Sequence, residues 1–182
     1  MIALADFQDE TVFFSAFFER GFFGKKEEHQ VAKDIKQLEE DWLAASHRKQ
    51  IPALLNQHNT TYFAALCSFS KKVARSVSLE SVIYLTNQAK KLNLPLSIGL
   101  FGSTGKPTTY QACITSDWQI ELEPSQFEYA FVSRLPCDDG CGWISCLEVF
   151  GAEGELLLQV QGACEDQQAE NLRLRELFSS LS

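Results

Sequence analysis

Positive charge is scarce in this chain, and long apolar runs are absent. Lys and Arg number 16 against 24 Asp and Glu, which gives a formal net charge of −8. This excess of acid argues against a nucleic acid or an anionic membrane surface as partner, because both need a basic patch. No apolar run reaches the ~18 residues of a membrane-spanning helix, so membrane insertion is not expected.

A secretory leader and the common catalytic motifs are also missing. Residues 1–6 have no basic stretch followed by an apolar one, so a cytoplasmic protein with reduced cysteines is expected. His29, His47 and His58 belong to no HExxH pattern, and no GxSxG is present. Residues 102–106 lack the spacing of a phosphate-binding loop and are interpreted as a connection between strands. No catalytic residue is assigned from the sequence.

Three cysteines lie close together but do not have the pattern of a metal site. Cys137, Cys141 and Cys146 have the spacing C-x3-C-x4-C, and no fourth Cys or His is nearby. Structural zinc sites usually have four ligands in paired knuckles. We interpret the segment as a turn flanked by reduced thiols, with Cys146 packed as a small apolar residue. A regulatory disulfide between Cys137 and Cys141 is the alternative.

The length of 182 residues and the apolar content of 45% are those of one globular domain. A chain of this size buries about two-thirds of its unfolded surface, so it needs no disulfide or metal for stability. No internal repeat, low-complexity tract or linker is visible. Residues 1–182 are therefore expected to form a single domain, with residues 1–40 as a Phe-rich helical extension.

The spacing of apolar residues changes from helical to strand-like near residue 94. Helices are predicted over residues 25–45, 51–55, 60–76, 78–93 and 166–181, and strands over 96–101, 110–114, 118–122, 129–134, 143–150 and 156–160. Helices first, then consecutive strands, then one helix indicate an α+β fold. We expect an antiparallel β-sheet packed with N-terminal helices and one C-terminal helix.

Phenylalanines crowd into residues 7–23. Phe13 and Phe17 are four residues apart, as are Phe14 and Phe18, which puts them on one helix face. Such a face fits a partner groove or a membrane-surface anchor. It fits better a helix that packs on its own domain or on a dimer mate, because the segment lacks the Lys/Arg-rich polar face of an interfacial anchor.

The most informative segment is 143–162, which predicts a β-hairpin with its turn at Gly151-Ala152-Glu153-Gly154. Within it, residues 146–156 read CLEVFGAEGEL. This resembles the segment S-L-E-L-F-D-x-x-G-E-L of the cytoplasmic haem-utilisation (haemin-degrading factor) proteins. Residues 129–140 resemble that family's W-V-V-R-K-P followed by D-G, and residues 159–177 run parallel to its Q-x-F-G-K-R-K-P-G-x-P-E-x-x-x-W-R-x-L.

The resemblance extends over about residues 42–178 and implies a haem-binding or haem-trafficking protein of haem and iron utilisation. Typical members carry two such repeats, and this chain would be one repeat, as in single-domain members that pair as homodimers. Haem is then the implied cofactor. Degradation of haem needs an open iron position and an electron source, and the sequence shows neither, so an enzymatic role is not assigned.

The resemblance also implies which residues would contact haem. Residues 42–55 can be laid over the family's W-x-x-x-T-D-x-H-x-F-x-x-L-L, whose His is the axial ligand. Lys49 occupies that position and His47 lies two residues earlier, a shift that rotates a helical side chain by ~200°. A lysine ligates iron only when neutral, which requires burial and a lowered pKa. Arg134 matches the family arginine, and its alternative role is a surface salt bridge.

The family's K-R-K run reads Ala163-Cys164-Glu165 here, so cations that would pair with haem propionates are replaced. Cys164 offers a thiolate as another axial ligand. Two other functions therefore stay open. In one, the chain keeps the scaffold without haem and acts as a protein-interaction module; in the other, it binds another planar apolar ligand.

Overall fold

The computed structural model describes residues 30–101, 112–113, 124–137, 142–162 and 170–181. Its helices are α2 (Ile35–Ala44), η1 (Arg48–Gln50), α3 (Ile51–Gln57), α4 (Tyr62–Ser68), α5 (Glu80–Leu92), η2 (Pro124–Gln126) and α6 (Leu172–Ser180). Its strands are β1 (Ala74–Val77), β2 (Leu96–Leu100), β3 (Ala112–Cys113), β4 (Tyr129–Pro136), β5 (Trp143–Phe150) and β6 (Leu156–Gly162). The predicted α+β fold is confirmed.

The strands form one six-stranded sheet in the order β1-β4-β5-β6-β2-β3, and every neighbouring pair is antiparallel. The predicted hairpin is present as β5 and β6, with Leu147 opposite Val160. Gly154 closes its turn with a φ of 74°, a left-handed conformation that glycine adopts without steric cost. Strand β5 pairs antiparallel with β4 on one side and with β6 on the other, so these three strands form the centre of the sheet.

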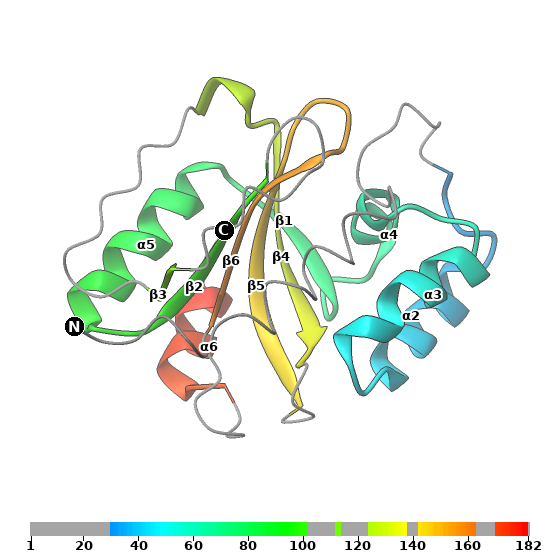
Figure 1. Cartoon of the computed structure of the whole chain (residues 1–182), viewed down its shortest axis with the longest axis horizontal. Coiled ribbons are helices and arrows are strands. Elements are labelled where there is room, and N and C mark those ends of the chain that lie inside the picture. The colour runs from blue at the N-terminus through cyan, green and yellow to red at the C-terminus, as the bar shows by residue number, and fades with distance from the viewer. Residues whose placement is uncertain (1–29, 102–111, 114–123, 138–141, 163–169, 182) are drawn as a thin grey trace, which may run out of the picture.

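Both faces of the sheet carry a core, because successive side chains on a strand point to opposite sides. On β5, Cys146 and Phe150 join one hydrophobic cluster, whereas Leu147 and Val149 join the other. Helices α2, α3 and α4 cover the first side, here called the α2–α4 face, and α5 and α6 cover the second, the α5–α6 face (Figure 1). The cysteine Cys146 is fully buried as a small apolar residue, as predicted.

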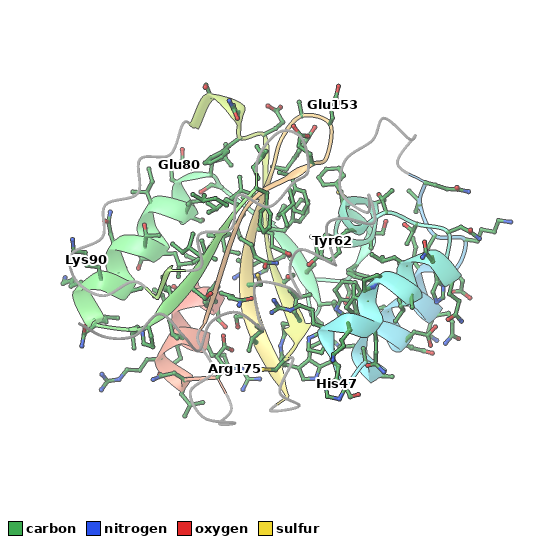
Figure 2. All side chains as sticks on the ribbon, viewed as in Figure 1. His47, Tyr62, Glu80, Lys90, Glu153 and Arg175 are labelled. Carbon is green, nitrogen blue, oxygen red and sulfur yellow. The ribbon has the colours of Figure 1, made fainter. Side chains whose placement is uncertain are left out.

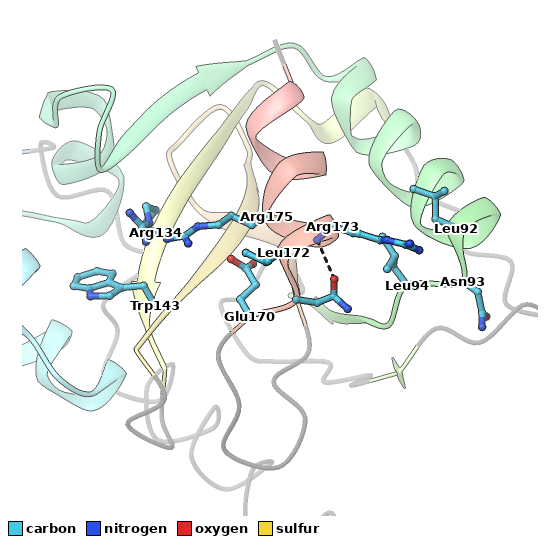
Figure 3. Close-up of a pocket in the computed structure, with 10 residues that line it drawn as sticks. Leu92, Asn93, Leu94, Arg134, Trp143, Glu170, Leu172, Arg173 and Arg175 are labelled. Atoms are coloured by element: carbon cyan, nitrogen blue, oxygen red, sulfur yellow. Dashed lines mark hydrogen bonds between the residues drawn. The ribbon is translucent and has the colours of Figure 1, made fainter.

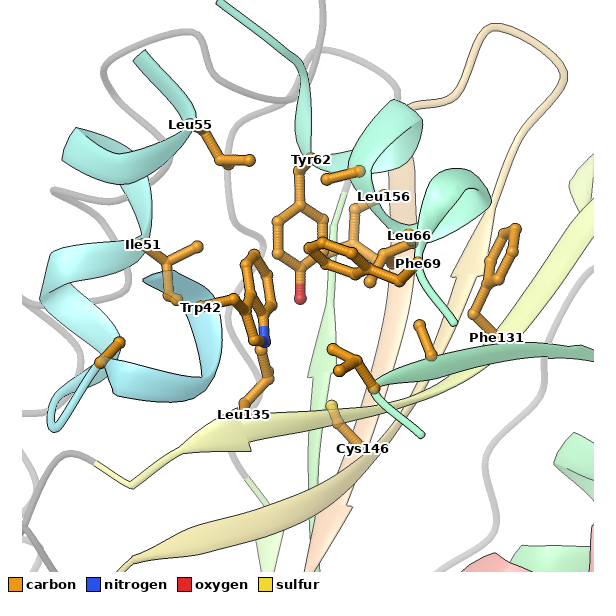
Figure 4. Packing of buried hydrophobic residues seen from close by; sticks show 14 of the residues in the cluster. Trp42, Ile51, Leu55, Tyr62, Leu66, Phe69, Phe131, Leu135, Cys146 and Leu156 are labelled. Carbon is orange, nitrogen blue, oxygen red and sulfur yellow. The ribbon is translucent and has the colours of Figure 1, made fainter. Parts of the chain in front are cut away.

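Aromatic side chains dominate the core on the α2–α4 face (Figure 4). Trp42 is fully buried, and its ring centroid lies 5.0 Å from that of Phe69 and 5.9 Å from that of Tyr62. The Trp42 indole Nε1 donates a hydrogen bond of 3.0 Å to the carbonyl oxygen of Arg134, so the ring is tied to β4. Helix α2 is thereby fixed against the central strands.

The core on the α5–α6 face is mainly aliphatic, with Phe178 as a buried aromatic residue. Leu85 of α5 and Leu174 of α6 are fully buried with Val149 and Val160 of the sheet. Arg75 of β1 donates hydrogen bonds to the last carbonyls of α6, those of Phe178, Ser179 and Leu181. A cation at these carbonyls satisfies groups that a helix end leaves unpaired and interacts favourably with the helix dipole.

Several predicted helix boundaries are wrong. Residues 30–34 and 170–171 fall within predicted helices but lie before the first residues of α2 and α6. Residues 74–76 were expected in a helix, but α4 ends at Ser68 and Ala74–Val77 forms β1. The chain turns at Ser70, whose N–H and hydroxyl donate to the Glu39 carboxylate, and β1 then pairs with β4. Although the apolar spacing of this stretch is helical, the hydrogen bonds that it forms at the edge of the sheet stabilise a strand instead.

Several expectations fall on residues that the structure does not describe. These are the Phe-rich segment 7–23, the loop 102–106, the strand at 118–122, Cys141, and the triplet 163–165. Among the residues that are described, no helix is long and apolar enough to cross a membrane.

Candidate functional site

The turn that carries His47 and Lys49 is not a continuous helix. Helix α2 ends at Ala44, and the Gln50 side-chain oxygen accepts hydrogen bonds from the backbone N–H of Ser46 and of His47, at 2.8 and 3.0 Å. A short 3-10 turn follows before α3 begins. His47 and Lys49 are exposed on this turn, while Arg48 between them is buried.

Arg48 anchors the turn to the sheet. Only 5% of the residue is exposed, and its guanidinium donates a hydrogen bond of 2.8 Å to the side-chain oxygen of Gln161 on β6. Because the Arg48 side chain points into the interior, the side chains of His47 and Lys49 on either side of it point to solvent. The position of these two residues is therefore set by a neighbour that the sequence analysis did not single out.

A buried polar network lies next to Arg48 under helices α3 and α4. Glu148 of β5 is completely buried and accepts hydrogen bonds from the Tyr62 hydroxyl at 2.5 Å, the Ser133 hydroxyl at 2.7 Å and the Gln159 amide at 2.9 Å. Burial raises the pKa of the Glu148 carboxyl, and these hydrogen bonds counteract part of the rise. Burial likewise raises the pKa of the Tyr62 hydroxyl, and the Glu148 charge adds to that rise.

This network explains the glutamate of the CLEVF segment. A carboxyl in an otherwise apolar strand requires partners, and here three side chains from three elements supply them. The network holds α4, β4 and β6 in register at the middle of the molecule. Glu148 is thus a structural residue of the site region, not an exposed acid.

His58 and Asp41 form a second polar pair, on the outer side of the helices. The His58 Nε2 lies 2.8 Å from an Asp41 carboxylate oxygen, and 11% of the histidine side chain is exposed. The pKa of Asp41 is lowered chiefly by the hydrogen bond from His58 and next by that from Gln37. The pair joins α2 to the end of α3. The residues that these hydrogen bonds bring together include no nucleophile.

Arg134 lies on the other side of the sheet from His47 and Lys49. Its neighbours on β4, Ser133 and Leu135, face the α2–α4 core, so the Arg134 side chain projects from the α5–α6 face. There it lines a cavity of about 970 Å³. The described residues around that cavity are Leu92, Asn93, Leu94, Arg134, Trp143, Glu170, Asn171, Leu172, Arg173 and Arg175 (Figure 3).

The cavity is basic within an acidic molecule. Its described lining has three arginines and one glutamate, whereas the whole chain has a net charge of −8. Both oxygens of Glu170 accept hydrogen bonds from Ser145, from its backbone N–H at 2.8 Å and its hydroxyl at 2.9 Å. Burial raises the pKa of Glu170, and Arg175 and Arg134 act to lower it. The carboxylate is thus held by the serine and only influenced by the arginines.

Trp143 connects the two regions. It lines the cavity with Arg134, whose guanidinium carbon lies 6.0 Å from the indole centroid, and it also packs against the aromatic core on the α2–α4 face. The structure therefore brings Arg134 together with Trp143 and Arg175 (Figure 3). The turn with His47 (Figure 2) and Lys49 lies across the sheet from them. No His/Cys/Asp/Glu group that could hold a metal ion occurs among the residues described.

Arg173 was not singled out from the sequence, and Arg175 falls in the segment 159–177 that resembles the family pattern. In LRLREL the two arginines are two residues apart, a spacing that puts them on different sides of a helix, so the sequence predicts no common cationic face. The convergence of Arg175 with the strand residue Arg134 could not be predicted either, because contact between β4 and α6 depends on the fold.

Comparison with known proteins identifies the fold. No family model matches this sequence, and no curated protein matches it. Among solved structures, the chain is similar to the heme degrading enzyme ChuS of Escherichia coli O157:H7, with a TM-score of 0.70, 20% identity, and coverage of 85% of this chain and 49% of that one. It is similar to holo-PhuS, a heme-binding protein from Pseudomonas aeruginosa, with a TM-score of 0.68, 23% identity, and coverage of 87% and 50%.

A third similar structure is ChuX, with a TM-score of 0.55, 9% identity, and coverage of 79% of this chain and 94% of that chain. The chain thus spans about half the length of the ChuS and PhuS chains and nearly the whole of ChuX. The resemblance to haem-utilisation proteins noted in the sequence is confirmed at the level of the fold: this chain has the architecture of one half of ChuS and PhuS.

Proposed function

We propose that this protein binds haem and serves haem handling in the cytoplasm, as part of haem and iron utilisation. The observation that carries the proposal is the fold, which matches a heme degrading enzyme and a heme-binding protein over 85% and 87% of this chain. The CLEVF hairpin supports it, since the part of the sequence most similar to that family forms the central strands. Binding or trafficking, not turnover, is the role proposed.

The residues present fit the two chemically distinct parts of haem. Arginines pair well with carboxylates, and Trp143 with Leu172 and Leu94 offers apolar surface to a planar ring. We assign a propionate contact to Arg134 as a second placement of haem, in the cavity, because the sheet separates Arg134 from His47 and Lys49 and one haem on a single chain does not reach both sides. His47 is the proposed iron ligand, through a neutral imidazole, and its exposure leaves it accessible. Lys49 is the other proposed ligand, but because it is exposed it would ligate iron only if bound haem buried it and kept its amine neutral. Bound haem would supply an iron centre that the chain's own residues do not provide.

The proposal includes a homodimer, because a single-repeat chain has half the length of the ChuS and PhuS chains. It also includes an alternative. If haem iron is not ligated, the same scaffold would bind another planar apolar ligand or act as an interaction module, and the arginine-lined cavity favours the former of these two.

Titration of the purified protein with haemin tests the proposal. If haem lies at the turn, we expect a saturable, sharp Soret band that is lost or shifted in His47→Ala or Lys49→Ala. If it lies in the cavity, binding should be about 10-fold weaker in Arg134→Ala. Lys36→Ala, which removes an exposed lysine of the same helical region, is the matched control and should behave as the wild type. A spectrum equal to that of a non-binding protein would refute haem binding.

A further inference from the structure

The cavity on the α5–α6 face has a pair of arginines whose side chains come from different elements and converge. Arg134 belongs to β4 and Arg175 to α6, and Figure 3 shows the two side chains reaching toward the same place above Glu170. Arg173 extends the other way along the cavity, toward Leu94. One end of the cavity therefore holds two neighbouring guanidinium groups.

The two guanidiniums are not neutralised within the described part of the chain. Neither Arg134 nor Arg175 forms an ion pair with any residue that the structure describes, and the nearby Glu170 has both oxygens bonded to Ser145. Two adjacent cations repel each other, and an anion between or in front of them removes that repulsion. The positive N-terminal end of α6, capped by Asn171, lines the same cavity and adds to its attraction for anions.

The rest of the described lining is suited to an apolar ring. Leu172 is 71% exposed and Leu92 is 46% exposed, although both are large apolar residues, and they flank the cavity with Leu94. Trp143 provides a flat aromatic surface beside Arg134. The volume of about 970 Å³ lies at the upper end of the range for small-molecule and cofactor sites, ~300–1,000 Å³.

The described lining has no iron ligand. It contains no histidine, cysteine or methionine, and its one carboxylate is held by Ser145. The described lining therefore offers groups that suit the acid groups and the apolar body of a ligand, and none that suits a metal at its centre.

We propose that this cavity binds a planar apolar dicarboxylate through Arg134 and Arg175, that Trp143 and Leu172 cover its ring, and that a metal in the ring is not required. The class of ligand is a tetrapyrrole with two carboxylates on one edge. This inference deepens the proposed function and rests on it for the nature of the ring, but it is independent of His47, Lys49 and iron.

Metal-free protoporphyrin IX is the probe, and its absorbance and the quenching of tryptophan emission are the measurements. We expect saturable binding that weakens about 10-fold or more in Arg175→Ala. Arg173→Ala removes the same charge from an exposed position on the same helix and should cost less than Arg175→Ala, because its side chain points away from the paired end. Lys71→Ala, in an exposed turn before β1, should bind as the wild type.

The dimethyl ester of the same porphyrin separates charge from shape. It should bind much more weakly than the diacid, and Arg175→Ala should not weaken it further. Equal binding of diacid and ester, or equal affinity in Arg175→Ala and Lys71→Ala, would overturn the proposal.

The two proposals fail in different ways. If haemin binds with its Soret band dependent on His47 or Lys49 while the metal-free ring does not bind, haem binding stands and this inference is wrong. If the metal-free ring binds through Arg175 and haemin gives no sharp Soret band, this inference stands and iron ligation is wrong. If neither porphyrin binds, both are wrong.

Discussion

At the scale of single residues, the interior of this protein is unusual for a fully buried carboxyl, Glu148, that is bonded to three side chains. A buried acid of this kind is costly to ionise, and its partners determine whether it is tolerated. Arg48 lies near enough to lower the pKa of Glu148 by its charge, although burial is the larger effect and raises it. The ionisation of Glu148 should therefore make the free energy of unfolding depend on pH.

Glu148→Gln should change the pH dependence of stability. A carboxyl whose folded pKa is raised contributes stability that is present below its unfolded pKa, near 4.5, and is lost as pH rises through the folded pKa. Glutamine has no proton to lose and can keep hydrogen bonds to Tyr62 and Ser133. The free energy of unfolding of the variant relative to the wild type should therefore increase as pH rises from 4 to 8.

Urea unfolding at a series of pH values measures this difference. Glu40→Gln, an exposed acid on α2, is the control and should show no such trend. A difference between Glu148→Gln and wild type that stays constant with pH would contradict the prediction. Comparing the two variants also cancels the contribution of Asp41, which has the opposite sign. The pKa of Asp41 is lowered in the folded protein, so its contribution to stability is present above the unfolded pKa and is lost as pH falls.

Tyr62→Phe should lower the free energy of unfolding by about 1–3 kcal/mol, because it removes the hydroxyl donor and leaves part of the Glu148 carboxyl without a partner. Tyr84→Phe removes the same hydroxyl from a residue that is 48% exposed, and its effect should stay within ~0.5 kcal/mol. Chemical denaturation of the two variants gives the values. Similar losses of stability in both variants would show that the buried hydrogen bond from Tyr62 to Glu148 adds no more stability than an exposed hydroxyl does.

At the scale of elements, two helices end with asparagine in the left-handed conformation. Asn59 after α3 has a φ of 49° and Asn93 after α5 has a φ of 51°. In both cases two backbone N–H groups return to the last turn: Thr60 donates to Leu55 and Asn59 to Asn56, while Leu94 donates to Ala89 and Asn93 to Lys90. This is the Schellman arrangement, which satisfies carbonyls that the helix leaves unpaired.

Asn59→Ala should destabilise the protein by about 1 kcal/mol, because a Cβ without a polar group is strained at this φ. Asn59→Gly should be neutral or slightly stabilising, since glycine adopts the conformation freely. Thermal unfolding followed by circular dichroism compares the two variants. An alanine variant as stable as the glycine variant would mean that the end of α3 relaxes to another conformation.

At the scale of the whole molecule, one sheet separates two cores. The aromatic cluster with Trp42 and Tyr62 and the aliphatic cluster with Leu85 and Leu174 lie on opposite sides of the same strands. Each core is held by its own helices, and the sheet is common to both (Figure 1). This arrangement predicts that the protein unfolds cooperatively, and that a substitution in one core does not change the effect of a substitution in the other.

Ile51→Val and Ile98→Val test this independence, because Ile51 belongs to the first core and Ile98 to the second, and both are fully buried. Each should lower the free energy of unfolding by about 0.5–1.5 kcal/mol. The double variant should lose the sum of the two within ~0.5 kcal/mol, since the side chains share no partner. A larger departure from additivity, measured by urea unfolding, would show that the cores are coupled through the sheet.

Local sequence patterns were enough to predict the α+β class, the hairpin around Gly154 and the burial of Cys146, because these follow from periodicity, turn residues and side-chain polarity. Tertiary structure decided the rest. Residues 74–77 form a strand because they hydrogen-bond to β4, and Arg48 points inward because it hydrogen-bonds to Gln161. Arg134 and Arg175 converge on one cavity because strand alternation and the packing of α6 place them on the same face, which no one-dimensional pattern of residues specifies.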